Sequence, residues 1–467
     1  MQYSPYHTTP SQDFVLGNLP GHKAVALFCG GSGRAFKFGP LLGACLADVA
    51  RGRTPRFDVA RLDPRRVIEC EQENTMRDDE DAALGKAHVP WGAQGRGVYS
   101  LSTRGCYDVI ASAANQAGEA VAAVLTESDS GAGGPIRLCD FGAADGGTSL
   151  HFWGKIIRQC REAAPSRQID MVYEEQPNAD FQSLFYFTQG RIRANGDAEK
   201  SFLQEHPAGT VFVSAVGTSF HTQCLPSSTL SFGFSATAMH WLSSKPGPLP
   251  PTAIHHSQLA ADAPERQAWV AQAEKDWNAI LLGRANELIP GGRLLIVSLA
   301  IDEEKQCLGH TDAVKRKMFD EMLRHWKAME KEGKITPDEF ARTAFLNYYR
   351  DIDECCRPFN DTSSQAYKAG LRLVSCRTRV TPCPYRAHWL KEGGDPMEYA
   401  KNFVPTMRTW SNSTFKSALD ESRSETERDS LVDELFTRLA VAVAKSPEDY
   451  GMDYVHTHLE VKKMATS

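Results

Sequence analysis

The sequence predicts an α/β fold built on a doubly wound parallel sheet, and three observations indicate it. The apolar stretch 137–141 stops in small residues, and apolar residues at helical spacing follow over 149–157, as expected for a strand, a tight turn and a helix. A second apolar stretch, 168–173, ends in two acids at the distance that a βαβ unit gives its second strand. Further apolar stretches that fit buried strands lie at 209–215, 231–234 and 293–300.

The chain begins with a block of its own, because 24–29 predicts a strand and 36–49 an amphipathic helix. Residues 13–16, 19–22, 31–40 and 57–58 resemble the C-terminal segment of monomeric sarcosine oxidase-type flavoprotein amine oxidases. In that family flavin is held mainly by an N-terminal domain, which has no counterpart here, and the flavin-anchoring cysteine would fall near Ser4. We therefore interpret 1–64 as a remnant or an appended packing element, with a partner-binding arm as the alternative, and 65–90 as a charged linker.

The turn after 137–141 is expected to face a ligand, because ligands of open α/β sheets bind beyond the carboxyl ends of the strands. Its small residues let a ligand approach the backbone. The turn has no Gly-x-Gly-x-x-Gly pattern, and Asp140 and Asp145 would repel a pyrophosphate. S-adenosylmethionine is cationic and has no phosphate, so it fits this turn. An ordinary glycine-rich turn without a ligand is the alternative.

The second strand ends in Glu174 and Glu175, and a carboxylate there can accept hydrogen bonds from both ribose hydroxyls. Either acid alone would be typical of a solvated surface charge. Acids at two successive strand ends are more specific, and they favour a nucleoside cofactor.

The remaining elements follow from periodicity and from start and stop signals. Helices are expected at 107–126, 264–288, 311–333, 399–418 and 424–444, a turn and helix at 235–242, and strands at 371–381 and 454–461. Thr336-Pro337-Asp338-Glu339 is a capping sequence for one more short helix.

The stretch 174–185, Glu-Glu-Gln-Pro-Asn-Ala-Asp-Phe-Gln-Ser-Leu-Phe, resembles Asn-Asp-Leu-Pro-x-Asn-Asp-Phe-Asn-x-x-Phe of the SABATH methyltransferases. Further matches lie at 216–220, 225–226, 229–232, 235, 240–243 and 289–293, and the resemblance runs from about Trp91 to near the C-terminus. These plant-type enzymes methylate carboxylates such as salicylate and indole acetate, or ring nitrogens in caffeine synthesis. The resemblance implies a Rossmann-like class I methyltransferase sheet over 91–467, with the helices of a substrate-binding cap mainly within 305–420.

The resemblance also implies which residues bind S-adenosylmethionine. The segment 91–100 is similar to the family's N-terminal Gly-x-Gly-x-x-Ser-Tyr segment, which folds over the cofactor, and Ser219-Phe220 matches the adenine-contacting pair. The implied cofactor-binding residues are Tyr99, Thr103, Asp140, Gly142, Ala144, Glu175, Gln176, Ser219, Phe220 and Ser235.

For the acceptor, the family's carboxylate clasp consists of a tryptophan and a glutamine. Trp241 stands at the tryptophan position, but Cys106 replaces the glutamine, and Trp91 stands near the position of a family lysine. A thiol is a poor substitute for an amide donor. The departures leave open an amine or ring-nitrogen acceptor, or a clasp rebuilt from Arg104, His221 or His240. Tyr348 and Tyr349 are expected to line the acceptor pocket, with an ordinary core position as the alternative.

Methyl transfer to a carboxylate needs no general base, so no catalytic residue is expected beyond those that position the reactants. The family's Phe-Asn-x-Pro signature appears only as Phe345-Leu346-Asn347-Tyr348, so its magnesium is not indicated. No metal is expected, because the sequence contains neither Cys-x-x-Cys nor His-Glu-x-x-His. The adjacent His255-His256 are not part of a metal-binding motif.

With 467 residues, 42% hydrophobic and 24% charged, the composition is typical of a globular protein. A net charge of -6 argues against nucleic acid as a partner, and no stretch approaches the length of a membrane span. The expected partner is a small-molecule acceptor, the expected location is cytoplasmic, and a homodimer is possible, as in plant relatives. The leading hypothesis is an S-adenosylmethionine-dependent methyltransferase acting on a carboxylate oxygen, with nitrogen as the alternative atom. A nonenzymatic binding protein and a flavin amine oxidase are the competing classes.

Overall fold

The computed structural model describes residues 15–19, 22–29, 39–55, 90–127, 134–193 and 201–465, and the chain divides into two compact units, 1–87 and 88–467. In the first unit β1 (Val15–Leu19) and β2 (His22–Cys29) pair antiparallel and α1 (Gly39–Ala50) packs on both. Leu16, Leu42 and Cys45 form the buried centre of this unit. The expected strand and helix are therefore present, although 36–38 and most of the expected linker lie outside the described residues.

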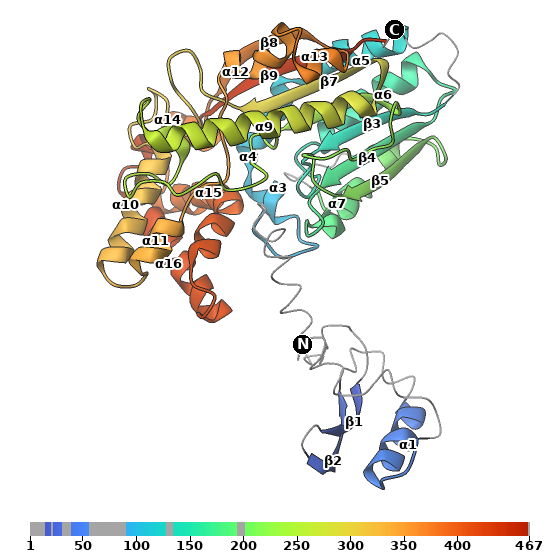
Figure 1. The fold of residues 1–467 in the computed structure, drawn as a ribbon, viewed down its shortest axis with the longest axis vertical. Helices are drawn as coiled ribbons and strands as arrows, with labels where there is room; N and C mark the ends of the chain where they lie inside the picture. The colour runs from blue at the N-terminus through green and yellow to red at the C-terminus, as the bar shows by residue number, and fades with distance from the viewer. Residues whose placement is uncertain are drawn as a thin grey trace. The chain divides into compact units, whose positions relative to one another are not determined.

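The second unit is built on a seven-stranded sheet with the order β5-β4-β3-β6-β7-β9-β8 (Figure 1). The strands are β3 (Ile136–Phe141), β4 (Ile169–Glu175), β5 (Val211–Gly217), β6 (Leu230–Ala236), β7 (Leu288–Leu299), β8 (Leu371–Thr381) and β9 (Tyr454–Lys463). Strand β9 is antiparallel to both of its neighbours, and the other pairs are parallel. The sheet is thus doubly wound, as the sequence predicts, with a C-terminal strand inserted in the opposite direction.

Helices cover both faces of the sheet, and strand β3 shows how the sequence directs them. Leu138 joins a core cluster with residues of α5 (Ala114–Glu127) and α6 (Leu150–Ala163). Cys139 joins a second cluster with residues of α9 (Pro264–Glu287), which crosses the opposite face in Figure 1. Successive side chains of a strand point to opposite faces, and both faces are covered, so the neighbouring residues Leu138 and Cys139 are both apolar and buried.

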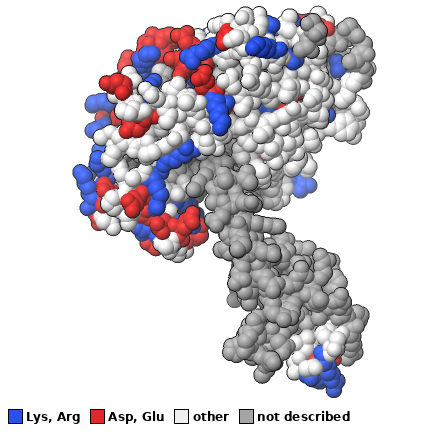
Figure 2. Space-filling model, in the orientation of Figure 1, with Lys and Arg blue, Asp and Glu red and all other residues white. Residues whose placement is uncertain are grey.

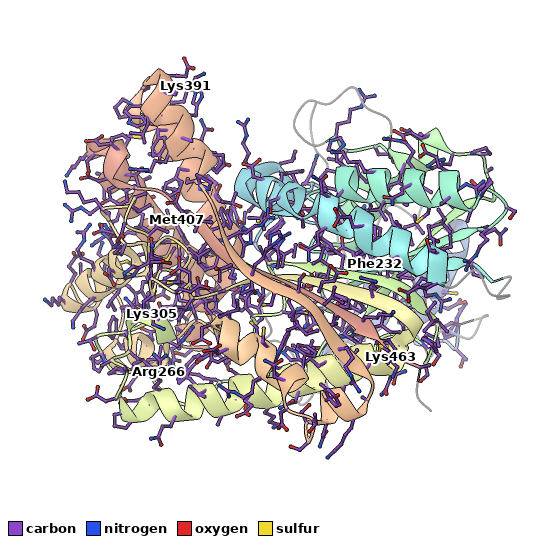
Figure 3. The ribbon with its side chains drawn as sticks, turned by 90° about the horizontal axis from the view of Figure 1, so that it is seen from above. Phe232, Arg266, Lys305, Lys391, Met407 and Lys463 are labelled. Atoms are coloured by element: carbon purple, nitrogen blue, oxygen red, sulfur yellow. The ribbon has the colours of Figure 1, made fainter. Side chains whose placement is uncertain are left out.

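The cap is helical and gathers beyond one end of the sheet (Figure 1). It contains α10 (Met318–Lys331), α11 (Pro337–Arg342), α14 (Pro384–Glu392), α15 (Pro396–Ala418) and α16 (Glu425–Lys445). Its core is aromatic: the rings of Trp326 and Phe415 lie 5.1 Å apart and those of Phe415 and Phe436 6.2 Å apart. Figure 3 shows the outer end of α14, marked by Lys391, projecting away from Phe232 in the sheet.

The remaining helices lie outside the cap. They are α3 (Val98–Ser102), α4 (Arg104–Ser112), α7 (Phe181–Thr188), α8 (Phe202–Glu205), α12 (Ile352–Asn360) and α13 (Gln365–Lys368), with short 3₁₀ turns η3 (His256–Gln258) and η4 (Pro447–Asp449). Helices α12 and α13 and strand β8 lie on the sheet side, although they fall within the range that the sequence assigned to the cap.

The structure corrects two predicted helices. The segment 235–242 forms no helix, because Thr237 adopts a left-handed φ of 51° directly after β6 and Trp241 pairs with Asn347 as an isolated bridge. The helix expected over 311–333 begins only at Met318, because the Thr311 hydroxyl donates a 2.6 Å hydrogen bond to Asp453 and the chain turns there. In both cases a long-range contact overrides the local pattern.

On the face shown in Figure 2, lysine and arginine are interspersed with aspartate and glutamate over the cap. No basic patch is visible on that face. Among the described residues, none of the helices combines the length and the apolar character that crossing a membrane requires.

Candidate cofactor and acceptor site

The candidate site lies where the strand order reverses, between the carboxyl ends of β3 and β6. From β3 the sheet extends through β4 to β5, and then it resumes at β6 on the other side of β3. Ligands of open α/β sheets bind at such a switch point. A cavity of about 30 Å³ is present here, lined by Tyr99, Ile110, Asp140, Gly142, Ala143, Ala144, Thr148, Ser149, Ala236 and Thr237.

The turn after β3 is shaped for close contact with its neighbours. Gly142 has a φ of 73°, and a Cβ placed there would lie 2.2 Å from the Cβ of Ala238. Ala144 and Thr237 also hold left-handed φ values, 52° and 51°, which are unfavourable for residues other than glycine. Both residues line the cavity, and strained backbone of this kind is concentrated at functional sites.

Asp140 is buried at the end of β3 and accepts hydrogen bonds from the Ser149 hydroxyl at 2.5 Å and the Trp153 indole N–H at 2.8 Å. Burial raises the pKa of Asp140 to about 6. It also raises the pKa of Asp145, which accepts from both the backbone N–H and the hydroxyl of Ser100. Asp140 therefore lines the cavity. Asp145 holds the segment that contains Ser100 against the turn after β3.

The acids at the end of β4 hold the same turn from the other side. Glu174 accepts the Gly142 N–H at 3.1 Å, and Glu175 accepts the N–H groups of Ala144 at 2.7 Å and of Gln176 at 2.8 Å. Burial is the largest cause that raises the pKa of both glutamates. Glu175 thus shapes the ligand-facing turn, and its predicted contact with a ribose stays a prediction.

The segment 90–102 covers the turn and is fastened to it. The Gly95 N–H donates to Asp180 at 2.9 Å, and the Gly97 N–H donates to the Ser183 hydroxyl at 2.7 Å. A second cavity of about 20 Å³, lined partly by Tyr99 and Ala144, lies beneath this segment. The two spaces hold little more than a few water molecules.

The other predicted cofactor residues lie around this site in different ways. Ser235 is fully buried at the end of β6, and its hydroxyl has no hydrogen-bond partner among the residues that the structure describes. The Thr103 hydroxyl donates to the Tyr99 carbonyl at 2.6 Å, so Thr103 serves the backbone between α3 and α4. Gln176 is partly buried beyond β4.

Ser219 and Phe220 follow β5, and α9 fixes their position. Phe220 lies near the turn, because a Cβ on Gly142 would be 3.8 Å from its ring. Arg284 of α9 donates a 2.7 Å hydrogen bond to the Phe220 carbonyl. The Ser219 hydroxyl lies 3.0 Å from His221 Nδ1, and His221 Nε2 lies 3.1 Å from the Trp241 carbonyl. The predicted adenine pair is thereby linked to the predicted acceptor residue.

The predicted acceptor residues His240 and Trp241 lie on the loop that follows β6. Thr237 lines the cavity, Ala238 packs on Gly142, and the Met239 carbonyl accepts a 3.1 Å hydrogen bond from Arg350. The partly buried Trp241 and the buried His240 follow, with ring centroids 5.4 Å apart. The structure therefore places the predicted acceptor residues next to the cofactor cavity.

Cys106 lies beside the start of this loop, where Thr237 is near enough to affect the pKa of its thiol, and Tyr348 is joined to the loop through its backbone N–H, which donates to the His240 carbonyl at 2.8 Å. Cys106 is buried on α4, where its Sγ lies 3.6 Å from the Tyr99 hydroxyl, and Arg104 is exposed. The Tyr348 hydroxyl donates to Glu354 at 2.8 Å and faces a different cavity, of about 460 Å³, between α9 and α12.

Sequence reasoning gave no acceptor role to His255 or Asn347, although it expected Tyr349 near the acceptor. The Tyr349 ring lies 5.5 Å from that of His240 and 4.6 Å from that of His255. Asn347, which pairs with Trp241, is fully buried. The pair His255-His256 was visible in the sequence, but its partners lie far along the chain and no local signal points to them. Within the described ranges, no three His, Cys, Asp or Glu side chains form a group that could hold a metal ion.

The residues present fit S-adenosylmethionine. Among the ion pairs of the described residues, none involves Asp140, Asp145 or Glu175, so the buried acids at the site lack a cation. A sulfonium and an ammonium group would supply that charge. The unpartnered Ser235 hydroxyl and the small-residue turn are also consistent with a ligand that presses against backbone. Asp140 and Glu175, on adjacent strands, would hold its polar groups.

The sheet order and the ligand-facing turn define a Rossmann-like class I methyltransferase. A model of the family of S-adenosylmethionine-dependent carboxyl methyltransferases matches residues 91–464, and the chain belongs to this family. This result confirms the expected family and its cofactor.

Similar proteins agree with this assignment. A solved loganic acid methyltransferase with S-adenosylhomocysteine superposes with a TM-score of 0.60 at 16% identity, over 81% of this chain and 99% of that one, which shows the fold. Methyltransferase LUC1 of Fusarium sp is 26% identical over 49% of this chain and 57% of its own length. The chain thus spans little more than half the length of this curated relative.

A different relative matches a short stretch. The N-methyl-L-tryptophan oxidase of Salmonella newport is 46% identical over 54 residues, which are 12% of this chain and 14% of the oxidase. The match confirms the expected resemblance to a piece of an amine oxidase of this kind.

Proposed function

We propose that this chain transfers the methyl group of S-adenosylmethionine to a carboxylate oxygen of a small-molecule acid. The family match over residues 91–464 carries the proposal. The fold of a loganic acid methyltransferase, whose name specifies an acid, supports the same choice. A cytoplasmic location and a homodimer stay predictions of the sequence.

The arrangement of residues is suited to alignment. When bound, S-adenosylmethionine supplies an electrophilic methyl carbon. Asp140 and Glu175 hold the cofactor side, and Trp241 presents an indole face and one N–H donor to the acceptor. The segment 90–102 closes over the turn through Asp180 and Ser183 and keeps water out. A carboxylate is already ionised at neutral pH, so none of these residues has to remove a proton.

Nitrogen methylation is the second candidate, and Cys106 favours it. The thiol occupies the position of the family's glutamine, and burial raises its pKa, so it is a neutral, weak donor. A carboxylate therefore lacks one member of the expected clasp.

Methyl-transfer assays decide between a carboxylate and a nitrogen acceptor. Isotopically labelled S-adenosylmethionine is offered with panels of small acids and amines, and the products are identified by mass spectrometry. For a carboxylate acceptor we expect a rate that is nearly flat from neutral to mildly alkaline pH. An amine must lose a proton first, so its rate would climb over the same range. If the protein binds S-adenosylhomocysteine but methylates neither panel, it is a binding protein and the proposed activity is wrong.

A further inference from the structure

Three buried side chains near the loop of His240 and Trp241 have polar atoms without a well-formed hydrogen bond among the described residues. All three side chains are fully buried: Asn347, Tyr349 and His255. Within the described part of the chain, no hydrogen bond is made by the Asn347 amide atoms, the Tyr349 hydroxyl or His255 Nε2. An unsatisfied buried polar group costs about 1–3 kcal/mol, so native structures rarely keep several together.

The three side chains lie next to one another. The ring centroids of His255 and Tyr349 are 4.6 Å apart. Asn347 lies within hydrogen-bonding range of both His255 and Tyr349 and affects the pKa of each, but neither contact has the geometry of a well-formed hydrogen bond. The polar groups therefore face one another without well-formed hydrogen bonds, and each keeps capacity to bond a ligand atom.

The proton on His255 can be placed. Its Nδ1 accepts the Ser257 backbone N–H at 3.1 Å, so it carries no proton there. Burial lowers the pKa of His255 well below its usual value, and the ring is neutral. The proton is thus on Nε2, the atom that lacks a partner. Together with the Asn347 amide and the Tyr349 hydroxyl, the cluster offers three donors.

The surroundings favour an electron-rich ligand group. Arg350, the residue after Tyr349, is buried and donates to the carbonyls of Met239 and Ala273, and no ion pair to it is found among the described residues. The Tyr349 backbone is held rigidly, because its N–H donates to His256 Nε2 at 2.7 Å. The ring of Phe319 stacks on that of His255, with centroids 4.0 Å apart, and so covers one face of the imidazole.

The position relative to the cofactor follows from the loop after β6. Thr237 lines the cofactor cavity, Trp241 comes four positions later, and Asn347 pairs with Trp241 on the side of the cap. The cluster therefore lies farther from the cofactor cavity than Trp241, the residue that is expected to orient the reacting group.

We propose that His255, Asn347 and Tyr349 bind an oxygen-bearing group at the end of the acceptor opposite to the methylated atom. This inference rests on the proposed function and narrows its substrate class to bifunctional acids, in which a carbonyl, hydroxyl or second carboxylate lies several atoms from the methylated carboxylate. The three residues determine specificity and take no part in methyl transfer.

The first test needs no acceptor and compares thermal unfolding of the full chain with that of Asn347→Leu. An amide without partners weakens the fold, so the leucine variant should melt at a higher temperature. A lower melting temperature would show that Asn347 bonds within the protein and would overturn the proposal.

The second test compares kcat/KM for monoacids and for matched hydroxy-, keto- and dicarboxylic acids. The wild-type chain should prefer the bifunctional member of a pair by about tenfold or more, because a site built for a polar group rejects the analogue without it. Asn347→Leu and Tyr349→Phe should lose this preference while affinity for S-adenosylhomocysteine is unchanged. Tyr399→Phe is the matched control, since its hydroxyl donates to the Tyr450 carbonyl at 2.9 Å. Equal rates for both members in the wild type would overturn the inference, whereas methylation of no acid at all would overturn the proposed function.

Discussion

Asp140 is the residue on which the charge of the cofactor site depends most. It lies at the end of β3, is buried, and has a pKa raised to about 6 by burial, so it is ionised at neutral pH without a cationic partner. The Ser149 hydroxyl and the Trp153 indole compensate its charge only in part. A cationic ligand that supplies the missing charge is therefore favoured over a neutral or anionic one.

We predict that S-adenosylmethionine binds more weakly as the pH falls through about 6. A cation favours the ionised carboxylate, and below this pKa Asp140 is protonated in the free protein, so binding has to release a proton. The dissociation constant should then rise by up to about tenfold per pH unit. Calorimetry from pH 5 to 8 checks this, with Asp140→Asn expected to bind weakly at every pH. A dissociation constant in the wild type that does not change with pH would disprove the role of Asp140.

Trp241 is the residue expected to orient the acceptor. We predict that Trp241→Ala mainly lowers kcat while cofactor affinity changes little, because the indole is expected to contact the acceptor and not the cofactor. The backbone carbonyl that meets His221 is kept in this variant. Steady-state kinetics combined with S-adenosylhomocysteine titration separates the two effects.

Trp389→Ala is the control for Trp241. Trp389 is also partly buried, but it packs against Tyr399 in the cap, and its loss should leave turnover unchanged. A fully active Trp241→Ala protein would show that the acceptor is oriented elsewhere.

At the scale of elements, the end of α9 positions the loop after β5. Arg284 and Glu287 form a fully buried ion pair with a 2.6 Å hydrogen bond. Arg284 also donates to the carbonyls of Phe220 and Thr222, and Glu287 accepts backbone N–H groups of Cys224 and Leu225. One helical turn thus satisfies the backbone of a loop that would otherwise be free to move.

We predict that Arg284→Met destabilises the chain by about 3–5 kcal/mol, because it leaves Glu287 charged and buried without its partner. Urea unfolding measures this. Affinity for S-adenosylhomocysteine should also fall, since Phe220 loses its anchor. Arg158→Met breaks an exposed pair with Glu205 and should cost less than about 1 kcal/mol. If both variants lose the same small amount, the α9 pair is not what holds the loop.

At the scale of the whole molecule, the two compact units match different proteins. Residues 91–464 of the unit 88–467 match the methyltransferase family. The short match to an N-methyl-L-tryptophan oxidase covers only 14% of that protein, too little to include a flavin-binding domain. The residues described in the unit 1–87 form a hairpin and a helix around a few apolar side chains.

We predict that residues 1–87 carry no chemistry. A variant that begins at His88 should bind S-adenosylhomocysteine and transfer methyl groups like the full chain, because every contact described at the site comes from residue 90 onward. Calorimetry and methyl transfer test this together with an absorption spectrum of the full chain. Flavin absorbance in the purified protein, or loss of transfer in the shorter variant, would contradict it.

The sequence by itself determined the doubly wound sheet and much of the cofactor side of the site. Asp140 and Glu175 were predictable because a strand, a turn and a helix are encoded within a few neighbouring residues, and the strand ends follow from that pattern. The same holds for the helix cap at Thr336, where the predicted capping box is present.

Only the tertiary structure decided the acceptor side. The predicted helix at 235–242 gave way to a left-handed Thr237 and to the pairing of Trp241 with Asn347, while Tyr348 faces the cavity between α9 and α12 and Tyr349 packs against His240. His255 and Asn347 lie close together although they are 92 positions apart in the sequence (347 − 255). No periodicity records such a contact, because it depends on how the cap packs against the end of β6, and packing is a property of the whole chain.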